Sequence, residues 1–206
     1  MNVHLYLQPE MRTRDDSKEK AIRQQAFKMI VKDGFEGFSM QKLARAAKVS
    51  PGTLYIYFKH KEDLILQLCR EEGKRMTDAT LKGFDPTMPF SEGLKVQWIN
   101  RARYCLKNPL QIAFLEQLKH SSLQQKASEI MSERFREIMG EFVINSIKRN
   151  ELVKVPVEVY WSIAFAPLYN LVKFHQNKTS VGGRKFELSD KLMMETLALV
   201  LKALKP

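Results

Sequence analysis

The chain has 206 residues, 44% of them hydrophobic, which is enough to bury a core and excludes an intrinsically disordered polymer. Its 34 Lys and Arg exceed its 23 Asp and Glu, and the formal net charge of +11 favours an anionic partner such as nucleic acid or an acidic membrane surface. Cys69 and Cys105 are too few for a disulfide framework, so a reducing, cytoplasmic setting is expected.

The first ten residues, MNVHLYLQPE, have neither the basic start nor the long apolar run of a secretory signal. No later segment approaches the ~18 apolar residues of a membrane-spanning helix. We expect residues 1–16 to form a flexible tail. A second methionine, Met11, leaves open where the ordered protein begins.

Two helices are predicted directly after this tail. Apolar residues at spacings of three and four indicate a helix over 17–33, and Gly34 is expected to end it. Ser39 is a favourable N-cap for a second, short helix that ends near Ala47.

A third short helix is predicted to start at Ser50, a capping residue followed by a proline at the first helical position. Leu54 and Phe58 lie four residues apart and are expected to face the core. The residues left to point outward or sideways are Pro51, Gly52, Thr53, Tyr55 and Tyr57. A fourth helix is predicted from Lys61 to about Thr80.

Helical periodicity resumes after a break at GFDPTMPF, residues 83–90. It predicts helices over 91–106, 109–120 and 122–149. The stretch VKVPVEV alternates as a strand does, but Pro156 interrupts it, so we expect a loop that leads into a helix.

The last two predicted helices, VEVYWSIAFAPLYNLVKF and DKLMMETLALVLKAL, are apolar on nearly every side. Such a helix has to be covered all round. If the chain's own core covers one face and a second copy covers the other, two helices from each subunit form a homodimer interface. Two alternatives remain: other helices of the same chain cover them, or Pro167 only kinks a core helix.

Residues 39–64, SMQKLARAAKVSPGTLYIYFKHKEDL, have the pattern of a helix-turn-helix, whose second helix can enter the ~12 Å major groove of DNA. Outward tyrosines suit that role, because their rings can meet thymine methyls or sugars and their hydroxyls can meet phosphates. Gly52 would let the helix approach DNA closely. The alternative is that this helix-turn-helix binds no DNA and that Tyr55 is an ordinary surface residue.

At these residues the chain resembles the TetR/AcrR family of transcriptional regulators. GFEGFSMQKLARAAKVSPGTLYIYFKHKEDLI is similar to the family's N-terminal signature, and the resemblance covers roughly residues 18–66. It implies that the DNA contacts are made by Ser39, Gln41, Ser50, Pro51, Gly52, Thr53, Tyr55, Tyr57 and Lys61. Lys48 departs from the pattern, because the family often has glycine there and a left-handed conformation costs lysine roughly 1 kcal/mol.

With the helical periodicity, the resemblance implies an all-α protein of about nine helices. A three-helix DNA-binding domain would occupy 17–62, and a helical bundle at 63–206 would dimerise and hold a ligand. The expected function is that of a homodimeric repressor on a palindromic operator in double-stranded DNA, released by a small molecule, with the fourth helix as the lever between the two domains. A regulator that activates, or one without a ligand, remains an alternative.

Several residues are candidates for the ligand pocket, although core packing is the expected role of each: Trp98, Phe114, Phe135, Met139, Trp161, Phe165 and Tyr169. Arg101, Arg103 and His120 could pair with an anionic ligand, although a solvated face is the expected role. Arg12 and Arg14 could form an arm in the minor groove or belong to a solvated tail.

No enzyme, metal site or cofactor is expected. The four histidines are scattered without an HExxH pair, and there is no glycine-rich phosphate loop and no nucleophile elbow. The two cysteines lack metal-ligand spacing and are expected to be inert, with redox sensing as the alternative. A module for anionic membrane surfaces is the other alternative, but no helix combines a lysine-rich face with a wide apolar one.

Overall fold

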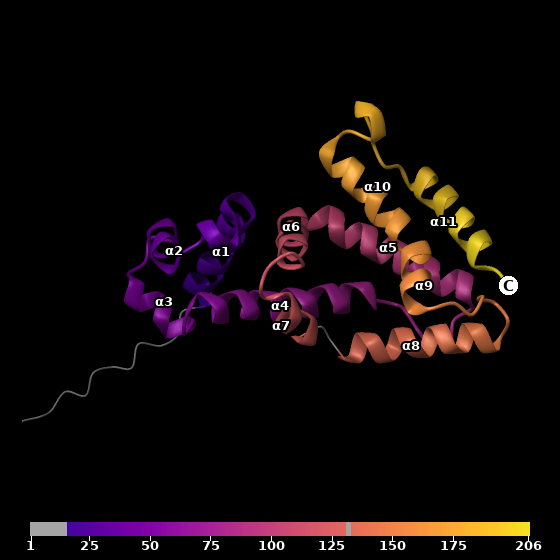
Figure 1. Cartoon of the computed structure of the whole chain (residues 1–206), viewed down its shortest axis with the longest axis horizontal. Helices are drawn as coiled ribbons and strands as arrows, with labels where there is room; N and C mark the ends of the chain where they lie inside the picture. The colour runs from indigo at the N-terminus through magenta and orange to yellow at the C-terminus, as the bar shows by residue number, and fades with distance from the viewer. Residues whose placement is uncertain (1–15, 131–132) are drawn as a thin grey trace, which may run out of the picture. The chain divides into compact units, whose positions relative to one another are not determined.

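The computed structural model describes residues 16–130 and 133–206, and in these ranges every element of two turns or more is an α-helix (Figure 1). The predicted all-α fold is confirmed. The chain divides into two compact units, one that ends at Leu66 and one that runs from Gln67 to Pro206. None of the helices in the described ranges is both long and apolar enough to cross a membrane.

The first unit contains α1 (Asp16–Gly37), α2 (Met40–Ala46), α3 (Pro51–Tyr57) and the start of α4 (Lys61–Thr80). As predicted, the regular part of α1 ends at Gly34, whose φ of 72° is accessible to glycine without strain. The core of the unit is formed by buried residues of all four helices and the segments between them, including Ile22, Ala26, Ile30, Phe38, Leu43, Leu54, Phe58 and Leu64.

The turn between α2 and α3 has the hydrogen bonds of a Schellman motif. The amide of Val49 donates to the carbonyl of Ala44 at 3.0 Å, and the amide of Lys48 donates to the carbonyl of Arg45 at 3.2 Å. Lys48 is the left-handed residue of the motif, with a φ of 55°. The strain expected at this non-glycine position is therefore present.

We expect Lys48→Gly to stabilise the protein by about 0.5–1 kcal/mol, because relief of the left-handed strain exceeds the entropy that glycine adds to the unfolded chain. Thermal unfolding should show a rise in Tm of about 1–4 °C. Lys48→Ala is the control, since it removes the same charge but keeps a Cβ in the strained conformation. An equal gain in both variants would mean that the lysine charge, and not the backbone, was the cause.

The second unit contains the rest of α4 and seven further α-helices, which are α5 (Phe90–Lys107), α6 (Pro109–Leu118), α7 (Gln124–Ile130), α8 (Glu133–Lys148), α9 (Val157–Ala164), α10 (Ala166–Asn177) and α11 (Asp190–Leu204). A short 3₁₀ turn, η1 (Val181–Gly183), lies in the connection between α10 and α11. Helix α10 packs on α5, and α11 packs on α9 and α10 (Figure 1). The loop before Val157 that Pro156 was expected to impose is present.

The structure divides two of the predicted helices. The segment over 122–149 contains α7 and α8, and the residues between them, with Met131, lie outside the described ranges. The segment with Pro167 contains α9 and α10, which are separated at Phe165. Proline has no N–H to donate and its ring clashes with the preceding turn, so a helix cannot continue undisturbed. The carbonyl of Ala164 then accepts a hydrogen bond from Trp98 Nε1 at 2.7 Å.

The two C-terminal segments are not fully covered by their own chain. Leu204, Leu197 and Leu168 are buried, but Val157 at the start of α9 is 67% exposed and Leu199 on α11 is 68% exposed. The alternative that other helices of the same chain cover these segments is therefore wrong for Val157 and Leu199.

Candidate nucleic-acid interface and buried pocket

Serine caps hold the two helices of the helix-turn-helix in place. Ser39 Oγ accepts a hydrogen bond from the amide of Lys42 at 3.3 Å, and Ser50 Oγ accepts one from the amide of Thr53 at 3.2 Å. The hydroxyls of Ser50 and Thr53 are 2.8 Å apart and also hydrogen-bonded. Three of the predicted DNA contacts therefore have a structural role of their own.

The outer face of α3 is exposed. Pro51 and Gly52 are exposed, Tyr55 is 56% exposed and Ile56 is 48% exposed. Leu54 on the opposite side is completely buried and anchors the helix. Sequence analysis missed Ile56, although the inward spacing of Leu54 and Phe58 already places residues 55 and 56 outside.

The expectation that Tyr57 points outward is wrong. The residue is only 7% exposed, and its ring lies 6.2 Å from that of Phe58. Because residues three and four apart share a helix face, Tyr57 lies on the buried side with Leu54. Its apolar ring contributes to the core of the first unit.

Lys61 is engaged within the protein. Its Nζ donates a hydrogen bond of 2.5 Å to the carbonyl of Phe35, which uses one of the three N–H donors of the ammonium group. The start of α4 is capped by other residues: His60 Nδ1 accepts from the amide of Asp63 at 3.2 Å, and Asp63 accepts from the amide of Lys59 at 2.8 Å. The acidic residues in this first turn interact favourably with the positive end of the helix dipole.

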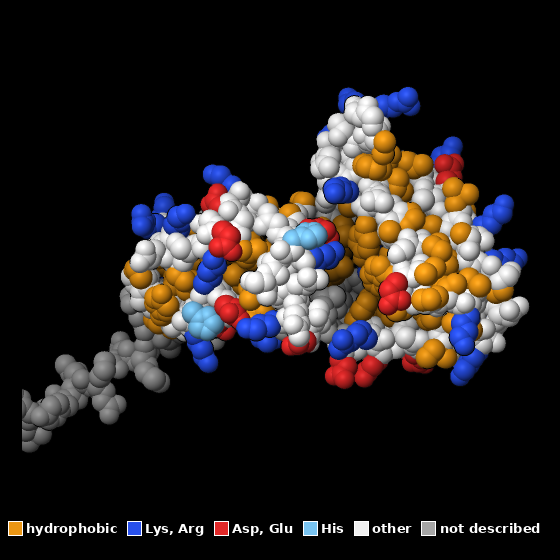
Figure 2. All heavy atoms as spheres, viewed as in Figure 1, with side chains coloured by type: hydrophobic (Ala, Val, Ile, Leu, Met, Phe, Trp, Pro, Cys, Tyr) orange, Lys and Arg blue, Asp and Glu red, His pale blue; other side chains and the backbone are white. Residues whose placement is uncertain are grey.

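Basic side chains near α3 in the sequence are exposed. They are Arg45 on α2, Lys48 in the turn and Lys59 after α3, and the neutral Gln41 on α2 is exposed as well. Figure 2 shows Lys and Arg side chains at the surface of the first unit. Lysine and arginine at such positions suit the phosphates of nucleic acid. Arg12 and Arg14, for which a minor-groove arm and a solvated tail were the alternatives, lie outside the described residues.

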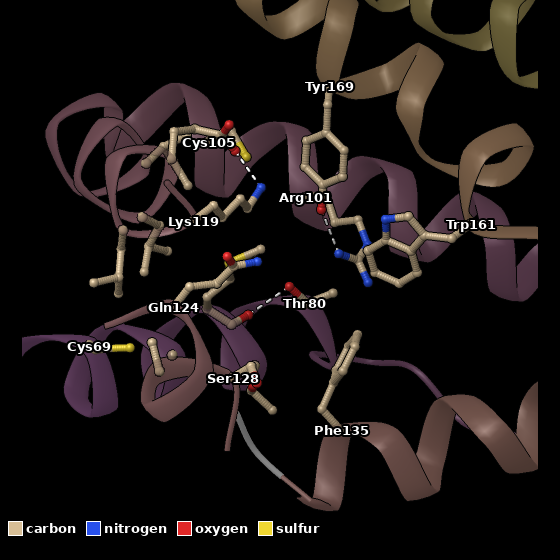
Figure 3. A pocket seen from close by; sticks show the side chains of 18 of the residues that line it. Cys69, Thr80, Arg101, Cys105, Lys119, Gln124, Ser128, Phe135, Trp161 and Tyr169 are labelled. Atoms are coloured by element: carbon tan, nitrogen blue, oxygen red, sulfur yellow. Dashed lines mark hydrogen bonds and ion pairs between the residues drawn. The ribbon is translucent and has the colours of Figure 1, made fainter. Parts of the chain in front are cut away.

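The second unit contains a pocket of about 510 Å³, within the range of small-molecule sites (Figure 3). Residues of α4, α5, α6, α7, α8, α9 and α10 contribute to its wall. Three of the predicted lining residues are there, namely Phe135, Trp161 and Tyr169. Four do not line it and are buried core residues, namely Trp98, Phe114, Met139 and Phe165.

Arg101 differs most from its expected role. Instead of a solvated face it occupies the pocket wall and is 2% exposed, whereas Arg103 and His120 are exposed as expected. The 3.6-residue period separates Arg101 from Arg103 by about half a helical turn, so the two arginines point to opposite sides of α5.

Cys69 and Cys105 are free thiols in the same pocket wall, and both are buried. Burial raises the pKa of the Cys69 thiol and raises the pKa of the Cys105 thiol to about 11, because the apolar surroundings disfavour a thiolate. At neutral pH both therefore remain protonated. The described residues contain no group of three or more His, Cys, Asp or Glu side chains placed to hold a metal ion.

The capped helix pair, the buried anchor of α3 and its exposed outer face define the first unit as a helix-turn-helix of the kind found in DNA-binding proteins. Residues 22–68 match the family described as "Bacterial regulatory proteins, tetR family". The match identifies the N-terminal domain as that of the TetR family, and with the relatives given below it supports a TetR family transcriptional regulator.

Known proteins resemble the chain in sequence and in fold. An uncharacterized HTH-type transcriptional regulator of Haemophilus influenzae is 33% identical over 90 residues, which are 44% of this chain and 48% of the relative. The match thus spans about half the length of that relative. A TetR family transcription regulator of Marinobacter aquaeolei has a similar structure, with a TM-score of 0.71 and 27% identity over 94% of this chain and 98% of the other. A Haemophilus influenzae TetR-family regulator has the same fold, with a TM-score of 0.72 and 21% identity over 92% and 99% of the two chains.

Proposed function

We propose that the protein is a sequence-specific DNA-binding repressor that acts as a homodimer and leaves its operator when a small molecule binds. The observation that carries the proposal is the outer face of α3. There Tyr55 and Ile56 expose large apolar surface next to Pro51 and Gly52, on a helix held by a buried leucine. Exposed apolar groups on a helix of this size are favourable when they contact base edges and sugars in the major groove.

Gly52 adds a second argument. A Cβ built at this position would meet only Ser50 Oγ, at 3.9 Å, so the fold leaves room for a side chain. In a helix, alanine is also more favourable than glycine by roughly 0.5–1 kcal/mol. The absence of a side chain is therefore not explained by packing, and it fits a helix that DNA approaches closely.

The exposed apolar surface of α9 and α11 supports a homodimer. Val157 and Leu199 would lose contact with water in an isologous interface, where the same helices of two subunits meet. A twofold arrangement would present two α3 helices to half-sites one DNA turn, ~34 Å, apart. The operator is then an inverted repeat in double-stranded DNA.

The pocket supports regulation by a small molecule. Helix α4 starts in the first unit and its later residues, among them Cys69 and Met76, line the pocket of the second. A ligand that binds better to a form unsuited to the operator lowers DNA affinity by its differential affinity for the two forms, typically ~1–3 kcal/mol. Helix α4 is the element through which we expect this coupling to act.

The test is selection of binding sites from randomised duplex DNA at about 0.15 M salt, followed by sequencing. We expect one inverted repeat to be enriched. Tyr55→Ala should weaken binding to that site by about 10- to 100-fold, because it removes contacts with the bases or sugars. Ile144→Ala is the control, since Ile144 on α8 is also exposed and lies in the other unit.

Binding that is salt-sensitive but enriches no sequence would contradict the proposal, because phosphate attraction alone gives no sequence preference. Equal losses of DNA affinity in Tyr55→Ala and Ile144→Ala would likewise contradict the proposed role of α3 in DNA binding.

A further inference from the structure

The guanidinium of Arg101 is a buried charge without a counter-ion. Its Nη1 donates to Tyr169 Oη at 2.7 Å and its Nη2 donates to Gln97 Oε1 at 3.2 Å, both neutral groups. Its Nε is buried and has no partner, and no described carboxylate forms an ion pair with it. Arginine keeps its charge in proteins. A buried charge of this kind is costly unless something anionic completes its surroundings.

Aromatic rings surround the same guanidinium. Its Cζ lies 4.3 Å from the ring centroid of Phe165, 5.2 Å from that of Trp161 and 5.3 Å from that of Phe135. Cation–π contacts at these distances offset part of the desolvation of the charge and hold the planar group in one orientation. They provide no acceptor for its N–H groups, so the hydrogen-bonding capacity that remains is available to a ligand.

Neighbouring side chains determine how the hydrogen-bond donors around Arg101 are oriented. Gln97 Nε2 donates to the carbonyl of Thr80 at 3.2 Å, which orients the amide so that its oxygen faces Arg101. Tyr169 accepts from Arg101, and its own hydroxyl proton has no acceptor within the described part of the chain. The proton of Tyr169 and the guanidinium can therefore donate to the same anionic group.

The rest of the pocket is suited to an apolar body. Figure 3 shows Arg101 and Trp161 on one side of the pocket and Cys69 on the other. Apolar side chains of several helices line the remaining wall, among them Met76, Ile112, Leu115, Leu118 and Ala127.

The other charges in the wall of the pocket neutralise each other. Lys119 Nζ and Glu116 Oε1 form an ion pair of 2.6 Å at an exposed position on α6. Among the described charged residues of the pocket wall, Arg101 is thus the one that is buried and has no opposite charge beside it.

From this arrangement we infer that the ligand is an apolar molecule with a single carboxylate, which Arg101 and Tyr169 bind inside the pocket. A carboxylate matches the planar donors of a guanidinium, and both partners are desolvated together. The inference rests on the proposed function, because it names the class of molecule that would release the operator.

The first experiment compares the affinities of the unmodified protein for ligands that differ only in their head group. Decanoate, 1-decanol and decylamine are titrated below their aggregation limits, and Trp161 in the pocket wall provides a fluorescence signal. We expect decanoate to bind saturably, about tenfold or more tightly than the alcohol, and the amine to bind most weakly, since charge-assisted bonds are about twice as strong as neutral ones. Equal affinities for decanoate and 1-decanol would overturn the inference.

The second experiment changes the charge. Arg101→Met keeps a long apolar side chain and should reduce decanoate affinity at least about tenfold while 1-decanol binding is kept. Arg103→Met, on the exposed side of the same helix, is the matched control and should change neither. Undiminished decanoate binding in a folded Arg101→Met protein would contradict the inference. If this variant does not fold, the head-group comparison still decides.

Failure of the inference is distinguishable from failure of the proposed function. If the protein selects an inverted repeat but does not discriminate between decanoate and 1-decanol, the DNA-binding proposal stands and the carboxylate inference is wrong. If it binds decanoate through Arg101 but selects no DNA sequence, the carboxylate inference stands and the DNA-binding proposal is wrong.

Discussion

Leu199→Glu is expected to make the protein monomeric and to weaken its binding to an inverted-repeat DNA site by about a hundredfold or more. Leu199 on α11 is exposed in the single chain, so the change should leave the monomer folded. In an isologous dimer that covers Leu199, however, it would bury an unpaired carboxylate on each subunit, which is strongly unfavourable. Loss of the dimer removes the simultaneous binding of two half-sites.

The oligomeric state is measured by light scattering and the affinity by titration with the selected DNA site. Ile144→Glu is the control, because it introduces the same charge at an exposed apolar position on α8. It should remain dimeric and lose only the small electrostatic contribution of one added negative charge. A Leu199→Glu protein that stays dimeric would show that α11 does not form the interface.

Gly93→Ala is expected to destabilise the second unit by about 3 kcal/mol. A Cβ on Gly93 would lie 2.4 Å and 2.6 Å from two ring atoms of Phe142 and 3.2 Å from Phe84. The ring of Phe142 has little room to move, since it is fully buried and packs against Phe84 and Phe90. The overlap outweighs the roughly 0.5–1 kcal/mol that alanine normally gains over glycine within a helix.

Thermal unfolding at one fixed protein concentration provides the measurement, and a decrease in Tm of about 6–12 °C is expected. Gly140→Ala is the matched control, because Gly140 lies within α8 and a Cβ there would meet nothing within 4 Å. This variant should be slightly stabilised. Similar Tm values for the two variants would show that α5 and α8 can move apart at no cost.

Local sequence signals determined the helices and the helix-turn-helix. Ser39 and Ser50 each cap a helix through a hydrogen bond to an amide three residues further on, so their effect depends on a few neighbouring residues. The positive φ of Gly34 and Lys48 follows equally from local backbone geometry. The apolar spacing of α3 is also a local pattern, and for this reason it is enough to place Tyr55 on the outside of the helix.

Signals that depend on distant partners are harder to interpret. The DNA contact expected of Lys61 does not anticipate its hydrogen bond to the carbonyl of Phe35, which is 26 residues away. Tyr57 is expected to point outward or sideways because Leu54 and Phe58 are assigned to the core, whereas the packing of the first unit also buries Tyr57. Nor does any sequence pattern reveal that Gly93 touches Phe142, because the contact joins two separate helices.

Arg101 shows this difference most clearly. The sequence by itself determined an all-α chain with an N-terminal helix-turn-helix, because caps, glycines and apolar spacing act over one or two helical turns. It could not decide which side of α5 would face the interior, and an arginine is ordinarily expected in solvent. Only the tertiary structure brought Phe135, Trp161 and Phe165 around that guanidinium, because burial depends on several helices packing together.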